Sequence, residues 1–545
     1  SKKVMAELES QGKSDRILPS RMVRRWKPAE QPGEPPTRKS RFCVRGDKDP
    51  DWQDLERYAP TLNTMSFSVA LQVAASEKMK ASVGDLKNAF CQSERLTRKN
   101  GALYMAQPRG GLPGLLEGQI IEIVAGCYGL GDAPSHWRKT LRKAVVEMGY
   151  RQAILDPTLF MLFVKGVLEG IILIEIDDLF TCGHQEHDAR MSELQKKFKF
   201  GKFARVQELE EGTSFNGRRV RQLADHSFEI DMQKFVEERL SPVTLAKGRK
   251  SDPKKLANDS EIAQLRAVIG ALAWAAKEGR PDGAAGASLG ASTRPKPVVQ
   301  DILDVNKAVM QLKENPSLSL KVKSIPAKDL AWGVVSDASF GNAHGGGSQG
   351  AHAIIAFHRK MFDGHRAPCS LIAWKSGRIH KVVNSTLAAE TQSLSRGLGD
   401  LSWAVSVFNE ITDPDFSIER WEEKLQENKV LAMISEKSQE TLREGMCIVD
   451  AKALYDHLCK VSVGPSADKR TALEMQVVRQ SMNAIGAQIR WVPHPKMIVD
   501  ALTKKGGKMD SLYELLRTGE YMIRAESDEL LDKKTERSER GYNRR

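Results

Sequence analysis

Several patterns that would assign a protein to a class at once are missing from this 545-residue sequence. Its seven cysteines are scattered, odd in number and without a CxxC pair, which argues against a disulfide framework or a zinc site and favours a reducing compartment. The longest apolar stretch, about residues 167–176, is far shorter than the roughly 20 residues that a membrane helix needs. The glycine run at 345–347 lacks the GxxxxGK[ST] pattern of a phosphate-binding loop, and no internal repeat is present.

The chain also has neither an initiator Met nor a secretory leader, since it begins SKKVMAELES. We therefore expect a segment processed from a longer polyprotein, or a truncated one. What the chain has in excess is positive charge, because 83 Lys and Arg stand against 70 Asp and Glu and give a net charge of +13. This excess favours a polyanionic partner without naming one, and a soluble basic protein with no such partner is an equal alternative on charge alone.

Hydrophobic periodicity and turn residues divide the chain into regions of different character. Charged, proline-rich residues 1–40 favour a surface arm or linker, and strand-like and helix-like segments then alternate to about residue 200. Residues 200–325 predict mainly helices, interrupted by a turn or flexible join at 279–297. After residue 325 the pattern is three strands and a helix, then a strand with its helix, and last a strand with a final helix at 495–505, which together predict a mixed α/β domain.

A first group of carboxylates lies at the ends of predicted strands. The run IILIEIDDLF places Asp177 and Asp178 at the end of an apolar strand, and Asp85 ends another. Asp85 alone is as well explained by a turn. Adjacent carboxylates in a partly desolvated site repel each other unless they are protonated or bind a cation, and Mg²⁺ or Mn²⁺ is the usual partner. Carboxylates from separate strands that hold two such cations are typical of two-metal phosphoryl transfer.

The motifs around these carboxylates resemble, in order, the reverse transcriptase of copia-type LTR retrotransposons. The similarity covers about residues 18–245 and continues more weakly through RAVIGALAWAAKEGRPD. The blocks that carry it are KSRFCVRG, RYAPTLNTMSF, GDLKNAF, LYMAQPRG, CYGLGDAPSHW, GYRQAILDPTLF and IEIDDLF.

The resemblance implies roles for individual residues. Asp85 and Asp177 would bind two metal ions, and Asp178 would complete the catalytic acidic pair. Phe90 falls where the family places an aromatic ring beneath the incoming sugar, where it would exclude ribonucleotides. The resemblance also places Arg41, Tyr128 and Gly129 at the nucleotide, with Lys39 and Arg45 as weaker candidates; solvated linker charges are the alternative for the three cations.

The sequence departs from the family pattern at two places. Glu175 stands where an aromatic residue usually precedes the acidic pair. In GLGDAP, Gly131 and Asp132 replace a basic and an amide residue. Both departures lie outside the expected metal ligands.

A second group of carboxylates is spread over the last predicted domain. Asp337 and Asp450 are expected to end strands and Asp500 to lie in the final helix. Glu390 lies at the margin of an apolar helical stripe, where a solvated glutamate would be unusual; the stripe is formed by Leu387, Leu394, Leu398 and Leu401. Four such carboxylates on a mixed sheet suit a second two-metal site, here with water as the nucleophile.

The order Asp, Glu, Asp, Asp on these elements resembles ribonuclease H, and the copia version in particular, over about residues 328–508. The resemblance implies that Asp337, Glu390, Asp450 and Asp500 are catalytic metal ligands that cleave RNA paired to new DNA. It gives His494, before the final helix, a possible part in product release. The motifs are SDASFG, IAWKSG, NSTLAAET, VDAKAL, DKRTALEM and WVPHPKMIVDALTKKG.

Together these features predict an α/β and α+β multidomain chain, a right-hand polymerase with fingers, palm and thumb followed by a ribonuclease H-like mixed-sheet domain. The expected cofactor is Mg²⁺, with Mn²⁺ as an alternative, two ions per site. The expected partners are RNA template, DNA primer, RNA/DNA hybrid, dNTPs and other Pol or Gag segments, with no membrane. The expected parts are an N-terminal arm at 1–17, fingers and palm at 18–215, a helical thumb or connection at 216–325, the ribonuclease H-like domain at 326–510, and a charged, partly disordered tail at 511–545.

The resemblance further implies a role in transposition and DNA integration, inside cytoplasmic virus-like particles or in the nucleus. Two other functions stay open. In the first, the chain is a catalytically decayed or co-opted element that only binds nucleic acid. Glu175 and Asp132 favour this function, and the retention of all seven carboxylates argues against it. In the second, it keeps only the hydrolytic activity.

Overall fold

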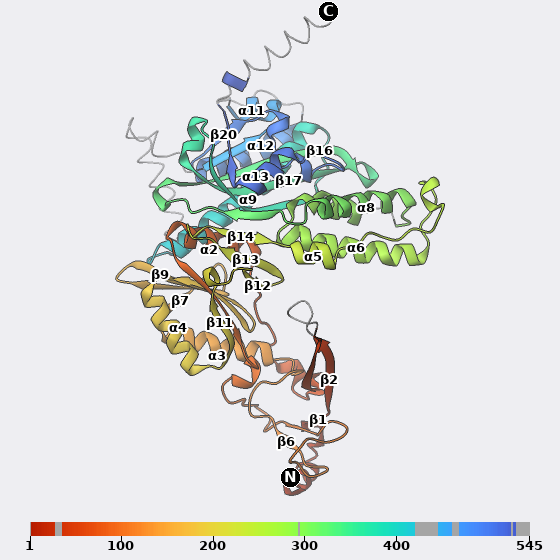
Figure 1. Cartoon of the computed structure of the whole chain (residues 1–545), viewed down its shortest axis with the longest axis vertical. Helices are drawn as coiled ribbons and strands as arrows, with labels where there is room; N and C mark the ends of the chain where they lie inside the picture. The colour runs from red at the N-terminus through yellow and green to blue at the C-terminus, as the bar shows by residue number, and fades with distance from the viewer. Residues whose placement is uncertain are drawn as a thin grey trace, which may run out of the picture. The chain divides into compact units, whose positions relative to one another are not determined.

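The computed structural model separates into two compact units (Figure 1). The first comprises Ser1–Leu62, Val83–Lys165 and Ile172–Phe203, and the second comprises Asn63–Ser82, Gly166–Ile171 and Ala204–Arg545. The structure describes residues 2–27, 35–292, 295–419, 445–459, 468–524 and 527–529. Among these residues, no helix is long and apolar enough to cross a bilayer.

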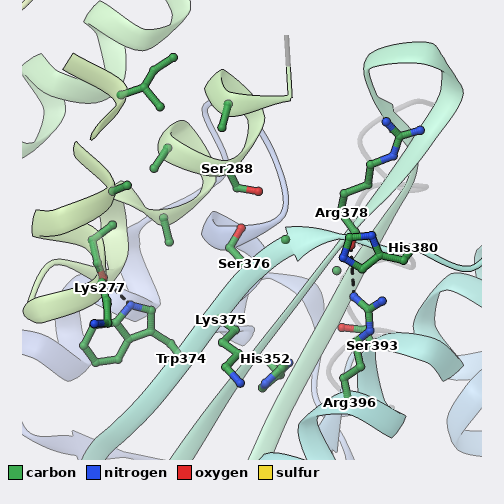
Figure 2. A pocket seen from close by; sticks show the side chains of 18 residues that line it. Lys277, Ser288, His352, Trp374, Lys375, Ser376, Arg378, His380, Ser393 and Arg396 are labelled. Atoms are coloured by element: carbon green, nitrogen blue, oxygen red, sulfur yellow. Dashed lines mark hydrogen bonds between the residues drawn. The ribbon is translucent and has the colours of Figure 1, made fainter. Parts of the chain in front are cut away.

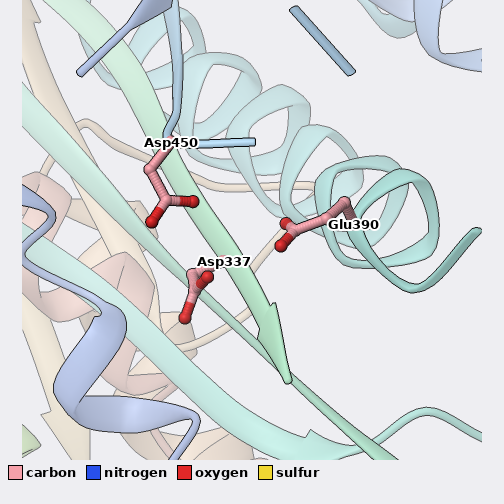
Figure 3. A group of neighbouring side chains, drawn as sticks. All are labelled: Asp337, Glu390 and Asp450. Carbon is pink, nitrogen blue, oxygen red and sulfur yellow. The ribbon is translucent and has the colours of Figure 1, made fainter. Parts of the chain in front are cut away.

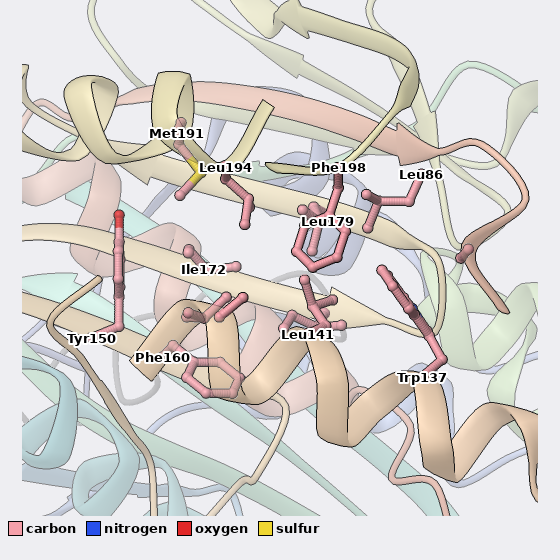
Figure 4. Packing of buried hydrophobic residues seen from close by; sticks show 14 of the residues in the cluster. Leu86, Trp137, Leu141, Tyr150, Phe160, Ile172, Leu179, Met191, Leu194 and Phe198 are labelled. Carbon is pink, nitrogen blue, oxygen red and sulfur yellow. The ribbon is translucent and has the colours of Figure 1, made fainter. Parts of the chain in front are cut away.

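A six-stranded sheet organises the first unit, in the order β11-β4-β10-β9-β8-β7. Its strands are β4 (Lys80–Leu86), β7 (Tyr150–Gln152), β8 (Leu159–Val164), β9 (Val167–Glu175), β10 (Asp178–Gly183) and β11 (Phe200–Arg205). Two amphipathic helices, α3 (Ala133–Glu147) and α4 (Gln185–Lys197), pack apolar side chains against the strands. Figure 4 shows Trp137 and Leu141 of α3 and Met191 and Leu194 of α4 pointing into this shared core.

The N-terminal region of the first unit is folded, contrary to the expectation of an arm or linker over residues 1–40. After helix α1 (Lys2–Ser10), strands β2 (Ser20–Lys27) and β3 (Thr37–Val44) pair along their whole length as an antiparallel ribbon. A small sheet combines β1 (Ile17–Leu18), β5 (Tyr104–Met105) and β6 (Ile121–Glu122). The basic composition was misleading because the two strands pair through backbone hydrogen bonds while most of their side chains stay exposed to solvent, where basic residues are tolerated.

The second unit contains a six-stranded mixed sheet in the order β20-β19-β16-β17-β18-β21. Strand β17 pairs antiparallel with both β16 and β18. On the other side, β19 pairs in parallel with β16, and β20 pairs in parallel with β19. Long helix α9 (Thr386–Thr412) packs on β16 and β17. The strands are β16 (Leu330–Ala343), β17 (Gly347–His358), β18 (Ala367–Arg378), β19 (Gly445–Val449), β20 (Ala487–Trp491) and β21 (Glu520–Tyr521).

The region expected to be helical, residues 200–325, also contains a four-stranded antiparallel sheet. Its strands are β12 (Thr213–Phe215), β13 (Arg218–Gln222), β14 (Phe228–Asp231) and β15 (Ser319–Val322). These strands are short and β15 lies far from the others in sequence, so that local periodicity did not reveal them. The ring of Phe67 in helix α2 (Thr64–Ser76) stacks on Phe215, with centroids 5.4 Å apart.

The helices of this region are α5 (Gln233–Glu238), α6 (Asp259–Glu278), α7 (Ala284–Ala291) and α8 (Val299–Glu314). Helix α7 replaces the flexible join expected at 279–297. It is rich in Gly and Ala and has poor helix propensity, yet Gly286 and Gly290 let it pack closely on α8. A Cβ at Gly286 would lie 2.4 Å from the Cβ of Ala308.

The C-terminal part of the second unit differs from the expectation in three places. Helix α12 (Lys469–Ala484), which the sequence pattern did not separate, follows α11 (Lys452–Cys459). The helix expected at 495–505 is instead two 3₁₀ turns, His494–Lys496 and Asp500–Leu502. The expected tail begins with helix α13 (Asp510–Thr518), which buries Leu512, Leu515 and Leu516; residues 530–545, also expected to be disordered, lie outside the described residues.

The predicted fold class is confirmed. The first unit combines a six-stranded sheet with helices α3 and α4, and the second carries the strand order and crossover helix expected of the ribonuclease H-like domain. The exact domain boundaries predicted from the sequence stay predictions.

Candidate active sites

Asp177 and Asp178 lie at a tight turn between β9 and β10, rather than at the end of one continuous strand. The turn consists of Ile176 and Asp177, and Ile176 has a φ of +56°, a left-handed conformation that is unfavourable for a β-branched residue. The indole Nε1 of Trp137 donates a hydrogen bond of 2.9 Å to the carbonyl of Ile176. Because Trp137 is fully buried in the core, this bond anchors the turn that carries the acidic pair.

Asp85 lies next to this turn, because β4 and β10 are neighbours in the sheet. The backbone N–H of Leu86 donates to the carbonyl of Asp177 at 2.9 Å. On the other side of β4, Gly201 of β11 leaves room for the Asp85 side chain, since a Cβ there would lie 2.8 Å from its Oδ2. The fold therefore brings the three predicted carboxylates of the first unit together where β4 ends and β10 begins, which is the edge of the sheet formed by strand ends.

The electrostatics of this edge favour binding of a cation. Burial, together with the charges of Asp177 and Asp85, raises the pKa of Asp178 to about 6. Burial also raises the pKa of Asp177, while Arg41 and Lys39 oppose the shift. A divalent cation would neutralise part of the charge of these carboxylates and so reduce their mutual repulsion.

Glu175, the departure that precedes the acidic pair, has a structural contact. Its Oε2 accepts a hydrogen bond of 2.7 Å from the backbone N–H of Leu62. Its charge also contributes to the raised pKa of Asp178. Glu175 thus ties the segment before α2 to the end of β9 and adds negative charge beside the turn.

Three residues predicted to bind the nucleotide are in contact with one another. The rings of Phe90 and Tyr128 meet edge to face with centroids 5.3 Å apart. The guanidinium of Arg41 lies over the Tyr128 ring, 5.2 Å from its centroid. The charges of Asp177 and Asp85 act on the Tyr128 hydroxyl, whose pKa is raised mainly by burial, so this cluster adjoins the acidic turn.

Gly129 follows Tyr128 with a φ of +99°, and a Cβ there would lie 2.0 Å from the carbonyl oxygen of Val44. No side chain fits this approach, in which Val44 donates to Tyr128 and Gly46 donates to Gly129 at 2.9 and 3.1 Å. Arg41 and Lys39 share one face of the β2–β3 ribbon and line a cavity of about 380 Å³. Arg45 instead pairs with Asp47 at 2.5 Å.

Asp132 and Gly131, the second departure, are explained by their neighbours. The guanidinium of Arg98 donates one hydrogen bond of 2.9 Å to the Asp132 carboxylate, whose other oxygen it contacts at 2.8 Å, and a second hydrogen bond of 3.1 Å to Asp49. All three side chains are almost fully buried. Gly131 has no room for a side chain, because a Cβ would lie 2.4 Å from the ring of Trp52.

The second unit gathers three of its four predicted carboxylates around one point. Asp337, Glu390 and Asp450 each offer a carboxylate oxygen, and these oxygens all lie within 4.8 Å of one another. Figure 3 shows the three side chains converging from a strand, helix α9 and the end of another strand. Asp337 lies inside β16 and not at its end as expected, whereas Asp450 directly follows β19.

These carboxylates are buried and under strong mutual repulsion. Burial, together with the charge of Asp450, raises the pKa of Asp337 to about 7. Burial also raises the pKa of Glu390 well above its ordinary value, with further contributions from Asp337 and Asp450. Among the residues that the structure describes, the buried Oε2 of Glu390 has no hydrogen-bond partner. A convergent set of oxygen ligands with an unpaired buried oxygen fits a hard divalent cation.

Asp500 lies beside this cluster in a 3₁₀ turn, and His494 connects the two. The imidazole Nδ1 is 3.0 Å from Asp450 Oδ2, and Nε2 is 3.5 Å from Asp500 Oδ1. Half-exposed His494 is thus in reach of groups that enter or leave the site. Its predicted part in product release stays a prediction.

Sequence reasoning missed two residues of this site, Thr503 and Lys504. The Thr503 hydroxyl donates to Asp337 Oδ2 at 2.5 Å, and the Lys504 ammonium contacts the Asp500 carboxylate. The negative charges of Asp337, Asp500 and Asp450 raise the pKa of Lys504, against the effect of burial. The i, i+4 spacing of Asp500 and Lys504 was the available signal, although it normally indicates only a helical surface pair.

Within the described part of the chain, Asp337, Glu390 and Asp450 are the one set of three metal-binding side chains that approach so closely. Asp85, Asp177 and Asp178 share a sheet edge without forming such a set.

Comparison with known proteins gives consistent results. Residues 5–248 match the family model described as reverse transcriptase (RNA-dependent DNA polymerase). The retrovirus-related Pol polyprotein from transposon RE1 of Arabidopsis thaliana is 22% identical over 388 residues, covering 68% of this chain and 25% of that protein. The corresponding polyprotein from transposon RE2 of the same plant is 23% identical over 389 residues, with the same coverage. The chain therefore spans about a quarter of the length of these relatives.

Among solved structures, the chain is similar to a foamy viral protease-reverse transcriptase in complex with double-stranded DNA. The TM-score is 0.42 at 10% identity, with 90% of this chain and 69% of the other covered.

Proposed function

We propose that this chain carries two activities. The premise is that the chain is a fragment of a copia-type retrotransposon Pol polyprotein with a reverse transcriptase domain at residues 5–248. The first activity is RNA-directed DNA synthesis at the edge that holds Asp85, Asp177 and Asp178. The second is ribonuclease H cleavage of the RNA strand of RNA/DNA hybrids at Asp337, Glu390, Asp450 and Asp500. The convergence of Asp337, Glu390 and Asp450 within 4.8 Å is the observation that carries the second activity.

Both sites would act by two-metal phosphoryl transfer. Two Mg²⁺ or Mn²⁺ ions per site would lower the barrier by activating the attacking oxygen and neutralising charge on the leaving group. In the first unit, Asp85 and Asp177 would hold these ions and Asp178 would complete the pair. In the second unit, Asp337, Glu390, Asp450 and Asp500 would hold them, with the hydroxyl of Thr503 orienting Asp337.

The nucleotide contacts of the first unit follow from the cluster of Arg41, Phe90 and Tyr128 beside the acidic turn. Arg41 and Lys39 would meet the triphosphate, and Phe90 would lie beneath the sugar and exclude ribonucleotides. Tyr128 and Gly129 would line the pocket. Arg45 is a poorer candidate, because Asp47 already neutralises it.

The proposed partners are an RNA template, a DNA primer, their hybrid and dNTPs, together with the other segments of the parent polyprotein. The net charge of +13 supports binding through phosphates, in which the shape of the duplex is recognised rather than its sequence. The proposed setting is the cytoplasmic virus-like particle, with a nuclear phase as the alternative.

A catalytically decayed, nucleic-acid-binding element is the second candidate function. Glu175 favours it, because a carboxylate replaces the family's aromatic residue and adds charge beside Asp178. Asp132 no longer favours it, because its charge is paired with Arg98.

Two assays in Mg²⁺ test the proposal: extension of oligo(dT) on poly(rA), and cleavage of a labelled RNA/DNA hybrid. Asp177→Asn should lower extension by about a hundredfold or more and spare cleavage, and Glu390→Gln should do the reverse, because each removes a ligand from one site only. Each variant is thereby the control for the other. Absence of both activities in the wild type, or variants that retain both, would contradict the proposal; loss of both activities from either change would indicate a structural fault.

A further inference from the structure

The turn that carries His494 has little support from its own backbone. It is a 3₁₀ turn of three residues, His494–Lys496, that follows β20, and the backbone N–H of Lys496 donates to the carbonyl of Pro493 at 2.8 Å. Pro493 and Pro495 have no N–H of their own to donate. Because so short a turn is marginal by itself, contacts with the rest of the chain decide where His494 lies.

Two hydroxyl groups from the C-terminal segment, helix α13 and strand β21, contact this turn. The Ser511 hydroxyl donates to the carbonyl of Pro495 at 2.6 Å, and the Tyr521 hydroxyl donates to the carbonyl of Lys496 at 2.7 Å. Tyr521 is only 7% exposed, and burial raises the pKa of its hydroxyl, which therefore keeps the proton that it donates. The two carbonyls that follow His494 are thus bound by side chains 16 and 25 positions further along the chain.

A buried carboxylate adds a third contact to the same turn. The Lys496 ammonium pairs with the carboxylate of Glu529, whose side chain is 6% exposed. Glu529, Ser511 and Tyr521 all belong to residues 511–545, for which the sequence predicts a charged, partly disordered tail. The described part of this region therefore contributes directly to the loop beside Asp450.

The C-terminal segment is itself fixed to the sheet of the second unit. Strand β21 pairs antiparallel with β18, with Tyr521 opposite Ala367. The guanidinium of Arg366 contacts the carboxylates of Glu514 and Glu520 at 2.5 and 2.9 Å, and α13 buries its apolar side. A segment anchored in this way can hold the turn of His494 in one position.

The turn that carries Asp500 is held by a different part of the fold. The carbonyl of Leu502 in this turn accepts a hydrogen bond of 2.5 Å from the hydroxyl of Ser376 in β18. Figure 2 shows Ser376 and Ser288 of α7 in the lining of a cavity of about 490 Å³, and the amide of Gln349 donates to both hydroxyls. Asp500 is thus supported from β18 and α7, so that the C-terminal contacts act on His494 separately.

We propose that the C-terminal segment positions His494 for ribonuclease H cleavage, with the hydroxyl of Tyr521 as the principal contact and that of Ser511 as the second. This inference rests on the proposed ribonuclease H function and adds two positioning residues to that site. The imidazole lies 3.0 Å from Asp450 Oδ2 and 3.5 Å from Asp500 Oδ1, and a shift of its turn would change both distances. Tyr521 and Ser511 act through His494 and do not touch the reacting atoms.

Kinetics of the full chain on a labelled RNA/DNA hybrid in Mg²⁺ test this role. Tyr521→Phe, which removes only the hydroxyl, should lower kcat about fivefold, the effect of one hydrogen bond, and leave KM nearly unchanged. His494→Ala should lower kcat at least as much. Adding Tyr521→Phe to His494→Ala should cause no further loss, because Tyr521 acts through the imidazole, whereas a merely structural role would make the two effects multiply.

The contact of Ser511 allows a rescue by the conservative change. Ser511→Ala should lower kcat in the same direction as Tyr521→Phe, and Ser511→Thr, which keeps a hydroxyl, should restore it. A Ser511→Thr variant as slow as Ser511→Ala would exclude the hydroxyl as the group that holds the turn.

Tyr513→Phe is the matched control for Tyr521→Phe. The Tyr513 hydroxyl also belongs to the C-terminal segment, but it contacts Gln311 and Asp282 at 3.3 and 3.5 Å instead of the turn, so its removal should leave kcat unchanged. An unchanged kcat in Tyr521→Phe or in His494→Ala, a further loss in the double variant, or an equal effect of Tyr513→Phe would overturn the proposal.

Amide hydrogen exchange separates this inference from the function on which it rests. In the metal-free protein, the amides of residues 496–499 should exchange about fivefold faster in Tyr521→Phe than in the wild type, and those of β17 should not change, because one hydrogen bond to the turn is lost. Unchanged exchange at 496–499, or a rise that extends to β17, would overturn the positioning role. If the wild type cleaves nothing, the proposed function fails, whereas the exchange result still supports or overturns the contact of Tyr521 with the turn.

Discussion

Arg98 shows how one residue can change the interpretation of residues that are distant from it in sequence. Asp132 and Asp49 are both buried, and each would be costly as an unpaired charge. The fork of the Arg98 guanidinium contacts both carboxylates, so that the network carries one positive and two negative charges. Asp132 is therefore part of a structural network in the first unit and is no sign of decay.

Removing Arg98 should be strongly destabilising. We expect Arg98→Ala to lower the free energy of unfolding by about 3–5 kcal/mol, because it leaves two buried carboxylates without a counter-charge. Arg95→Ala is the matched control, since Arg95 is 71% exposed and pairs with Glu122 at the surface; it should cost about 0–1 kcal/mol. Urea denaturation checks both, and equal effects of the two changes would show that the buried network contributes nothing.

Lys504 is the residue of the second site whose role depends most on its place in space. Its ammonium contacts the Asp500 carboxylate and interacts with the charges of Asp337 and Asp450, so it would offset part of their negative charge in the absence of the metal ion proposed for this site. The same position makes it a competitor of that ion.

In Lys504→Gln, the metal-free protein should melt at a lower temperature and should bind Mg²⁺ about threefold to tenfold more tightly, because the carboxylates have lost a competing positive charge. Calorimetric titration with Mg²⁺ and melting in EDTA measure the two effects. Lys505→Gln is the control, because Lys505 pairs with Asp304 at 2.6 Å and is not a partner of these carboxylates. Weaker Mg²⁺ binding in Lys504→Gln would show that Lys504 supports the metal site instead.

At the scale of elements, helix α7 illustrates packing that overrides propensity. Its sequence, AAGASLGA, has two glycines and no amphipathic pattern, and this composition predicted a join. The helix exists because α6 and α8 cover it, and Gly286 and Gly290 allow close approach to Ala308 and Val305. Short isolated helices are marginal in water, so that tertiary contacts decide whether such a segment is helical.

Two glycine substitutions in neighbouring helices should therefore have opposite effects. Gly286→Ala should destabilise the chain by about 1–3 kcal/mol, because its Cβ overlaps the Cβ of Ala308. Gly270→Ala in α6 should stabilise it by up to about 1 kcal/mol, because a Cβ there meets nothing within 4 Å and alanine is the better helix former. Urea denaturation measures both, and a stabilising Gly286→Ala would contradict the close packing of α7.

At the scale of the whole molecule, each of the two units carries its own set of carboxylates with raised pKa values. Asp177 and Asp178 in the first unit and Asp337 and Glu390 in the second all hold protons more tightly than they would in an unfolded chain. Both sets therefore affect the stability of the metal-free protein with the same sign.

The metal-free chain should lose stability as the pH rises. Unfolded carboxyl groups titrate near pH 4, whereas Asp178 and Asp337 have pKa values of about 6 and about 7 in the fold. Between these values the folded state binds more protons than the unfolded state, so the free energy of unfolding falls with rising pH. Urea denaturation in EDTA from pH 5 to 8 should show this fall, and a smaller one in Asp337→Asn. Parallel curves for the two proteins would contradict it, and saturating Mg²⁺ should abolish the difference.

Much of the architecture could be predicted because local hydrophobic periodicity indicates which segments are helices and which are strands. The strands β16 to β18, helix α9 and helix α3 follow the expected periodicities, and the match of residues 5–248 to reverse transcriptases confirms the family resemblance. The β2–β3 ribbon, the sheet β12–β15 and helix α12 could not be predicted, because their strands are short or basic or their boundaries carry no strong turn signal.

The sequence by itself determined which carboxylates form the two groups and placed Glu390 on a helix and Asp450 at the end of a strand, whereas the positions of Asp337 inside β16 and Asp500 in a 3₁₀ turn differ from the expectation. Only the tertiary structure decided which side chains contact these carboxylates. Lys504 contacts Asp500, Thr503 contacts Asp337, and Arg98 contacts both Asp132 and Asp49. Periodicity reports that a face is buried, because burial repeats with the turn of a helix or the pleat of a strand. It does not report which distant side chain lies opposite, and the charge of that neighbour changes a carboxylate's pKa in addition to the effect of burial.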